Sequence, residues 1–311
     1  MLSSRVRHEV SFWHGPDRCS GDLRLPTASG PHPVLVVVRE PHHRQRDYSP
    51  WLDRVADAGI ASFTWDRAQL RDGDPGPRRP IAHQAREVLA AVERLGRLPE
   101  VDAAATALVG WGEGGWAAAR AATYSDRLAA LILACTPAPD PAAHPAAGEG
   151  HDPRPTLSAL TLPVLALFGE QDPLVPLVES VRGVRTALAD AGHVDHEVAV
   201  VRGADHGLRV RAPHGLGPMV DGLHRFGDWP PPLTRLVVEW LEARLRPDGV
   251  PSYAPPLRPA AAPLRPHPRP AGVPAAASPA APSSAQARTA AALAALPAGV
   301  PVRQVRRRVA H

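Results

Sequence analysis

The chain of 311 residues contains no lysine, only two cysteines and no long apolar run. Because no run approaches 18 apolar residues, we expect no membrane span. Cys19 and Cys135 lie far apart and show no metal-ligand spacing, so we expect free thiols in a reducing cytoplasm. The first residues lack the apolar core of a signal peptide. All 35 basic residues are arginine, which we attribute to codon composition rather than to function.

Composition divides the chain near residue 246. Residues 247–311 consist mostly of Pro, Ala, Arg and Ser and include fourteen prolines. Such a segment buries too little apolar surface to fold, so we predict a domain over residues 1–246 and a disordered tail over 247–311. Eight arginines and one acid give the tail a charge of +7, and subtracting this from the total of +4 leaves −3 on the domain. The basic balance therefore indicates no specific binding of nucleic acid.

Apolar runs with strand-like and helix-like periods alternate through residues 8–245. The β-branched run His32–Val38 is typical of a strand buried on both faces, and apolar residues recur at helical spacing over 79–98. This alternation predicts an α/β fold with a mostly parallel sheet flanked by helices. We expect strands at 8–13, 19–25, 32–38, 60–65, 104–110, 128–135, 162–169 and 196–201, and helices at 50–59, 79–98, 112–123, 175–191 and 230–245.

The most informative segment is Ala107–Trp116, in which an apolar strand runs into a glycine-rich turn and then a helix. This is the pattern of a nucleophile elbow, Gly-x-Ser-x-Gly, whose strained turn raises a serine oxygen above the sheet. Gly110 and Gly114 occupy the flanking positions, but Gly112 stands where the serine belongs. Glycine has no nucleophilic group, so the sequence predicts a site without its central chemical group.

Two later segments follow in the order in which an acid and a histidine complete a catalytic triad. The segment Gly169–Pro176 resembles the Gly-x-x-Asp-x-x-Val-Pro loop and places Asp172 as the acid. The segment Gly203–Gly207 resembles the Gly-x-x-His-Gly loop and places His206 as the base. With the elbow, they resemble the α/β-hydrolase superfamily, in its dienelactone-hydrolase and acyl-esterase-like branch, over residues 10–245. The resemblance implies an α/β-hydrolase fold and chemistry on ester or acyl groups.

Other positions depart from the pattern of that superfamily. Relatives place a glycine-rich turn after the strand that here ends at Val38, and an amide of this turn binds the oxyanion. The present chain has Arg39-Glu40-Pro41; proline has no amide to donate, and Glu40 brings a negative charge to the place where an oxyanion forms. The segment 136–155 is short and rich in Pro and Ala, which predicts a minimal lid. We expect four residues to line the oxyanion region and the pocket: Arg39, Glu40, Trp111 and Glu113.

The sequence shows no metal-ligand spacing and no cofactor motif, since the elbow accounts for the glycines at 110–115. Basic residues gather directly after the predicted strand 32–38. A solvated loop is the simpler interpretation of this basic group, and an anion-binding role is the alternative. Cys135 ends a predicted strand and is a rival nucleophile to a bound water, although a lone buried cysteine is usually inert. The basic group consists of Arg39, His42, His43, Arg44 and Arg46.

Three functions remain open at this point. The first is a catalytically impaired relative that binds a small acyl or carboxylate-bearing ligand, or a partner, in the old cleft. The second is a low-activity ester or thioester hydrolase in which Asp172 and His206 activate a water beside Gly112. The third is an interaction protein that acts through its basic, Pro-rich tail. A cleft plugged by Glu40, Trp111 or the loop 39–46 would count against the first two. The sequence does not indicate an oligomeric state.

Overall fold

The computed structural model describes residues 6–40, 45–67, 79–137, 152–210, 219–220, 223–224, 228–246 and 302–305. The N-terminal strands β1 (Val6–His14) and β2 (Asp17–Leu25) form an antiparallel hairpin, as the sequence predicts. The other strands are β3 (His32–Val38), β4 (Ala61–Arg67), β5 (Val101–Trp111), β6 (Leu128–Ala134), β7 (Val164–Gly169), β8 (His196–Val201), β9 (Met219–Val220), β10 (Leu223–His224) and β11 (Val302–Val305).

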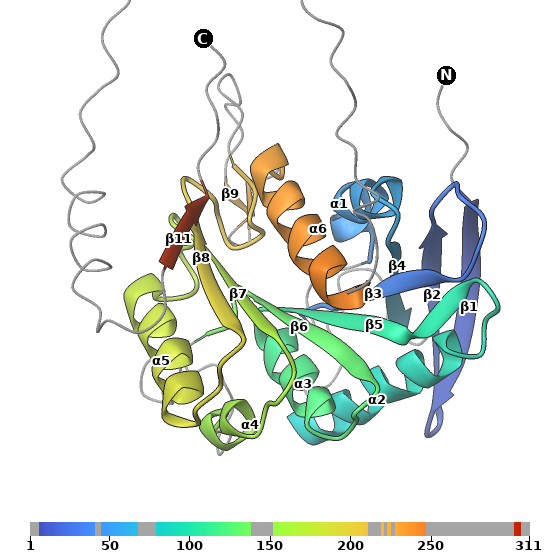
Figure 1. Ribbon diagram of the computed structural model, residues 1–311, viewed down its shortest axis with the longest axis horizontal. Coiled ribbons are helices and arrows are strands. Elements are labelled where there is room, and N and C mark those ends of the chain that lie inside the picture. The colour runs from blue at the N-terminus through green and yellow to red at the C-terminus, as the bar shows by residue number, and fades with distance from the viewer. Residues whose placement is uncertain are drawn as a thin grey trace, which may run out of the picture.

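Nine of these strands form one sheet in the order β1-β2-β4-β3-β5-β6-β7-β8-β11, which crosses the whole molecule (Figure 1). The hairpin joins the sheet through an antiparallel pairing of β2 with β4. From β4 to β11 the neighbouring strands are parallel. The carboxyl ends of these parallel strands therefore meet at one edge, where loops carry the chemistry in folds of this kind.

Helices cover both faces of the sheet (Figure 1). α1 (Gln45–Asp57) and α6 (Pro231–Leu245) pack on one face, and α2 (Ile81–Leu95), α3 (Glu113–Ala122) and α5 (Leu177–Asp190) pack on the other. The short α4 (Arg154–Ser158) precedes β7. Along β3, Val34 and Val36 belong to one apolar core and Leu35 and Val37 to the other. A strand buried on both faces needs apolar residues at every position, which explains the continuous apolar run.

The α/β-hydrolase architecture expected from the sequence is confirmed, with differences at the element ends. α1 begins before residue 50 and contains Pro50 in its interior, where proline has no amide to donate to the helix. The strand β11 was not predicted: Val302–Val305 lie within the proposed tail and pair in parallel with β8 at the sheet edge. Pairing over such a sequence distance leaves no local signal. The rest of 247–311 lies outside the described residues, as does 138–151 of the predicted lid segment, so both remain predictions.

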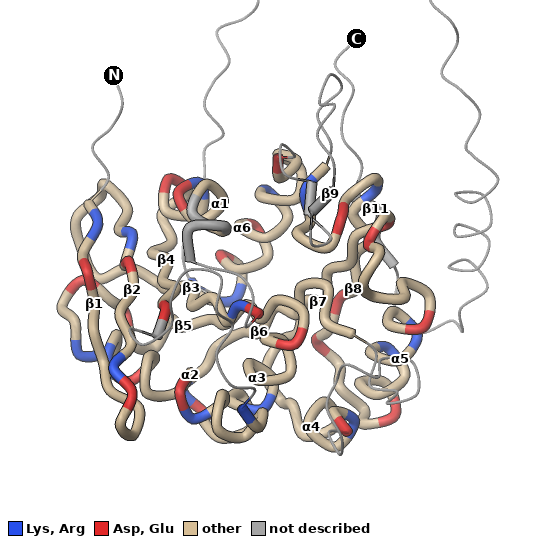
Figure 2. The backbone as a smooth tube through the Cα atoms, turned by 180° about the vertical axis from the view of Figure 1, so that it is seen from behind, with Lys and Arg blue, Asp and Glu red and all other residues tan. Residues whose placement is uncertain are grey.

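Charged residues are interspersed over the helices and the outer part of the molecule (Figure 2). The central strands β3, β6 and β7 carry no charged residue, as burial on both faces requires. Within the described ranges, no helix combines the length and the apolar character needed to cross a bilayer.

Candidate active site

The turn between β5 and α3 has the strained backbone of a nucleophile elbow. Gly112 has φ 51° and ψ −124°, a conformation that residues with a side chain adopt only where their surroundings enforce it. Its amide donates to the carbonyl of Ala134 at 2.9 Å. At Gly110, a Cβ atom would overlap the backbone of Gly115, so this glycine lets α3 pack closely on β5. The elbow is therefore built although its serine is absent.

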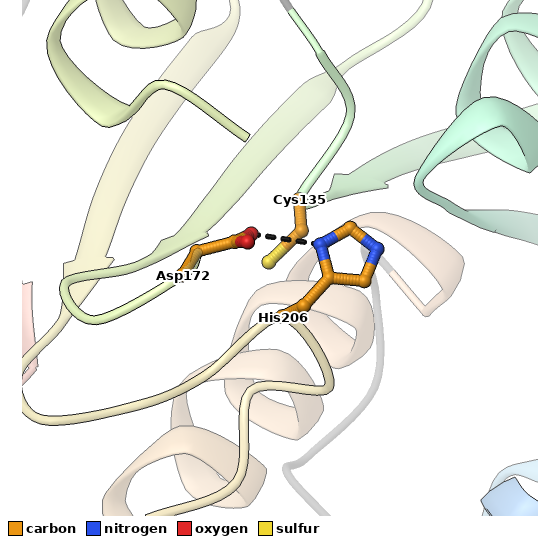
Figure 3. A group of neighbouring side chains, drawn as sticks. All are labelled: Cys135, Asp172 and His206. Carbon is orange, nitrogen blue, oxygen red and sulfur yellow. Dashed lines mark hydrogen bonds and ion pairs between the residues drawn. The ribbon is translucent and has the colours of Figure 1, made fainter. Parts of the chain in front are cut away.

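Asp172 and His206 form the acid–histidine pair that the sequence predicts. Nδ1 of His206 donates to Oδ2 of Asp172 at 2.8 Å (Figure 3). Oδ1 of the same carboxylate accepts the backbone amides of Leu174 at 2.8 Å and Val175 at 3.0 Å, which fixes it in the loop after β7. The loop after β8 brings His206 to this carboxylate, and the side chain of His206 is only 1% exposed. The two loops thus place an oriented imidazole beside the elbow.

Trp111 supports the His206 loop from the core side. Its Nε1 donates to the backbone carbonyl of His206 at 3.1 Å, and its ring packs against Tyr48 and Trp51 with centroid separations of 5.1 and 5.4 Å. The sequence suggested Trp111 as a pocket-lining residue in contact with a ligand. The structure buries it and makes it a positioning residue for His206.

Glu40, at the end of β3, occupies the space over Gly112. A Cβ atom built on Gly112 would overlap the Glu40 carboxylate, so a serine and this carboxylate cannot share the site as it stands. Oε2 of Glu40 accepts from Nε2 of His206 at 3.1 Å. Oε1 lies 3.4 Å from the amide of Glu113, and the amide after the nucleophile is the one that serves the oxyanion in related elbows. The carboxylate therefore contacts the base and this amide together.

This contact is what the sequence reasoning missed. Glu40 was expected in the oxyanion region as an intrusive charge, and not as the hydrogen-bond partner of His206. A usable signal was present, since glycine at 112 removes a side chain and a carboxylate at 40 can fill the space. The sequence alone could not show that the two positions face each other, because they lie 72 positions apart and the register between β3 and β5 brings them together.

Two carboxylates hold His206 in its protonated form. Burial lowers the pKa of His206, but hydrogen bonds to Asp172 and Glu40 and the charges of both acids outweigh it and raise this pKa from 6.5 to about 10. An imidazole that carries both protons donates through each ring nitrogen and has no lone pair with which to accept a proton. Near neutral pH the histidine is therefore an ion-pair partner rather than a general base.

Arg39 does not present a free cation to the site. Its guanidinium pairs with Asp66 at 2.7 Å and its Nε donates to the carbonyl of Trp65 at 2.9 Å, which ties the end of β3 to the end of β4. The structure thus gives Arg39 a partner of its own beside Glu40. The other members of the predicted basic group, His42, His43, Arg44 and the side chain of Arg46, lie outside the described residues.

The side chain of Cys135 lies beside the acid–histidine pair (Figure 3). Its sulfur, a carboxylate oxygen of Asp172 and a ring nitrogen of His206 lie within 4.8 Å of one another, and this is the one such group of potential metal ligands among the described residues. Burial, followed by the charge of Asp172, raises the pKa of the Cys135 thiol well above its ordinary value. A metal would need the thiolate and would have to separate Asp172 from His206, so the group fits a hydrogen-bonded cluster better than a metal centre.

Comparisons with known proteins agree with this arrangement. The model of the dienelactone hydrolase family matches residues 23–219, and no curated protein matches the chain. The fold is similar to that of a dienelactone hydrolase-like promiscuous phosphotriesterase from metagenomic libraries (TM-score 0.59, 22% identity, covering 77% of this chain and 98% of that one). It is also similar to an acylaminoacyl peptidase of Pyrococcus horikoshii (TM-score 0.60, 17% identity, covering 78% of this chain and 42% of that one). A dienelactone hydrolase of Anabaena variabilis is similar as well (TM-score 0.52, 17% identity, covering 78% of this chain and 99% of that one).

Identities this low speak for the fold alone, whereas the family model spans more than half of the sequence, including the elbow, the acid and the histidine. This chain therefore belongs to the dienelactone hydrolase family.

Proposed function

We propose that this member of the dienelactone hydrolase family does not turn over esters by nucleophilic catalysis, and that a ligand could bind in its former active site only by displacing the Glu40 side chain. One observation carries the proposal: the carboxylate of Glu40 lies over Gly112, bonded to His206 and adjacent to the Glu113 amide. The nucleophile, the base and one oxyanion donor are thereby lost or occupied at the same time.

The magnitudes support this proposal. Removing the nucleophile from a comparable triad lowers kcat by about 10⁶, and the remaining rate depends on the oxyanion hole and on substrate binding. Loss of an oxyanion donor lowers kcat by about another 10²–10³. With Glu40 on the Glu113 amide, both losses apply to the same site.

A water activated by Asp172 and His206 is the second candidate function, and the geometry counts against it. Such a water needs Nε2 of His206 as its acceptor, and this nitrogen already donates to Glu40. Cys135 is an equally poor substitute, since its thiol is fully buried and burial raises its pKa. For an interaction role of the tail, the described residues contribute only β11, so this alternative has no further support.

The proposal is tested by hydrolysis of short-chain nitrophenyl esters by the wild type and by variants at both facing positions. We expect the wild type to be no faster than His206→Ala. Gly112→Ser alone should also be inactive, because the new side chain meets the Glu40 carboxylate. In Gly112→Ser/Glu40→Ala the serine has space and His206 loses one acid, so we expect ester cleavage with an initial acylation burst.

The matched control is Gly112→Ala/Glu40→Ala, which relieves the same contact without a hydroxyl and should remain inactive. Hydrolysis by the wild type that disappears in His206→Ala would refute the proposal and establish a water-based mechanism. Inactivity of the serine double variant, with its fold shown to be intact by circular dichroism, would mean that the site lacks more than its nucleophile.

A further inference from the structure

We infer that two copies of this chain associate through the outer edge of β1, so that β1 of a second copy continues the sheet. β1 is the last strand on its side of the sheet, and no described strand pairs with it on the side away from β2 (Figure 1). It runs for nine residues, contains no proline and pairs with β2 without a bulge. Proline, bulges and short strands are common devices that keep other strands from such an edge. β1 has none of these three and is therefore open to pairing.

The edge strand is held in a fixed position before any partner arrives. The side chain of Arg24 on β2 is fully buried and donates to Asp53 of α1 at 3.0 Å. Arg7 on β1 reaches the same carboxylate at 3.0 Å. On the other face of β1, Val10 and Phe12 belong to the apolar core. A strand that is already ordered loses little conformational freedom when it pairs, which favours association.

The charges on β1 select one register for this pairing. A twofold axis brings the same strand of both copies together in antiparallel orientation. With Val10 opposite Val10 of the second copy, all nine residues of β1 have a partner, and Glu9 lies opposite Ser11. A shift that centres the pairing on Glu9 would bring two like charges together, which destabilises a cross-strand pair. The register centred on Val10 is therefore the favoured one.

Opposite charges meet across the interface in this register. Within one copy, Arg18 on β2 is exposed and donates to the hydroxyl of Ser11 at 3.2 Å. Glu9 accepts from Ser20 at 2.6 Å, so the hydroxyls of Ser11 and Ser20 lie between the two charges. Residues directly opposite each other on paired strands have Cβ atoms about 5 Å apart, which brings Glu9 of the second copy beside Ser11 and its guanidinium partner. The twofold axis forms this Glu9–Arg18 ion pair twice.

Trp13 provides the apolar part of the interface. It is 64% exposed, whereas the other six tryptophans of the chain are buried. Exposed aromatic residues of this size are typical of protein interfaces. In the same register, Trp13 lies opposite Arg7 of the second copy, whose guanidinium is held by Asp53. A guanidinium over the indole ring adds a cation–π contact to the apolar surface that the pairing buries.

The first test is the molar mass of the full chain in solution, measured by sedimentation over a range of concentrations. We expect the wild type to change from the 33.0 kDa of one chain to twice that mass in the micromolar range. Trp13→Lys should raise the dissociation constant at least about tenfold, because tryptophan is among the residues that contribute most to interfaces. The matched control is Val194→Lys, which alters an apolar residue that is 96% exposed and lies away from β1, and should leave the constant unchanged.

The second test reverses the two charges separately, with the fold of each variant checked by circular dichroism. Glu9→Arg and Arg18→Glu should each weaken self-association at least about tenfold, because like charges then face each other twice. In an equimolar mixture of the two variants, every facing pair is again of opposite sign, so we expect a heterodimer at concentrations where the wild type dimerises. The double variant Glu9→Arg/Arg18→Glu should self-associate as the wild type does.

A wild type that stays monomeric throughout the micromolar range would overturn the inference, as would a dimer that Trp13→Lys does not weaken. Charge variants that associate no better when mixed than alone would overturn the register and with it the assigned interface. A monomeric wild type that dimerises through Trp13 only after truncation at Arg246 would assign the edge to the tail of the same chain, which also overturns the inference.

Discussion

Replacing Glu40 by glutamine should lower the pKa of His206 while leaving the shape of the site unchanged. The amide oxygen of glutamine can still accept from Nε2 of His206, whereas its NH2 group cannot accept from the Glu113 amide. The change therefore removes a charge and the weaker of the two contacts, and keeps the hydrogen bond to His206. In the wild type, hydrogen bonds and charges of Asp172 and Glu40 overcome burial and raise this pKa to about 10. An opposite charge at such a distance changes a pKa by about 1–3, so we expect a value of about 7–9 in Glu40→Gln.

The raised pKa also predicts how the stability of the fold depends on pH. The pKa of His206 is higher in the folded protein than its ordinary value of 6.5. Its contribution is therefore complete below pH 6.5 and is lost as the pH rises toward about 10. A pKa difference of 1 between the folded and the unfolded protein corresponds to about 1.4 kcal/mol. The free energy of unfolding of Glu40→Gln should thus fall about 1.4–4 kcal/mol below that of the wild type at pH 6, and this difference should close by about pH 10.

The assay is an NMR titration of the histidine side chains in both proteins, with urea unfolding at several pH values beside it. His196, whose pKa burial lowers, lies at the start of β8 and should titrate identically in both, which makes it an internal control. A wild-type His206 that titrates near 6.5 would refute the reasoning, because the imidazole would then be neutral and available as a base at pH 7. An unchanged pKa in Glu40→Gln would refute the contribution of Glu40.

Three further predictions concern the surroundings of the site. Cys135 should not react with a thiol reagent in the native protein and should react on unfolding, because it is fully buried and burial raises its pKa; rapid native modification would contradict the buried placement. Trp111→Phe leaves the His206 carbonyl without its donor and should lower the free energy of unfolding by about 1–3 kcal/mol, measured by urea unfolding. The matched control is Trp51→Phe, which should lose packing only, because the indole nitrogen of Trp51 has no hydrogen-bond partner among the described residues. Truncation after Arg246 removes β11 and uncovers the edge of β8, so light scattering should detect concentration-dependent association; a monodisperse truncated protein would argue against a protective role of β11.

The sequence predicted the sheet, the elbow and the acid–histidine pair because each leaves a local signal. β3 is apolar at nearly every position, the elbow keeps its glycines at 110 and 114, and Asp172 and His206 each follow a strand in the expected order. The positions that it could not place are those whose roles arise from contacts across the fold. Arg39 has the sequence character of a free cation, but Asp66 lies beside it in the fold. Val302–Val305 have the composition of a disordered tail, because pairing with β8 depends on residues about 100 positions away.

Gly112 and Glu40 are best understood as one structural unit. Any side chain at residue 112 would meet the Glu40 carboxylate, so the glycine is what permits Glu40 to reach His206. In turn, without Glu40 the buried imidazolium would have Asp172 alone as an acidic hydrogen-bond partner. The two positions should therefore be strongly non-additive: Gly112→Ser should destabilise the wild type and cost less in Glu40→Ala, a coupling that a double-mutant cycle measures directly. Additive effects would mean that the carboxylate can leave the elbow freely, and the site would then be closer to a working hydrolase than its geometry indicates.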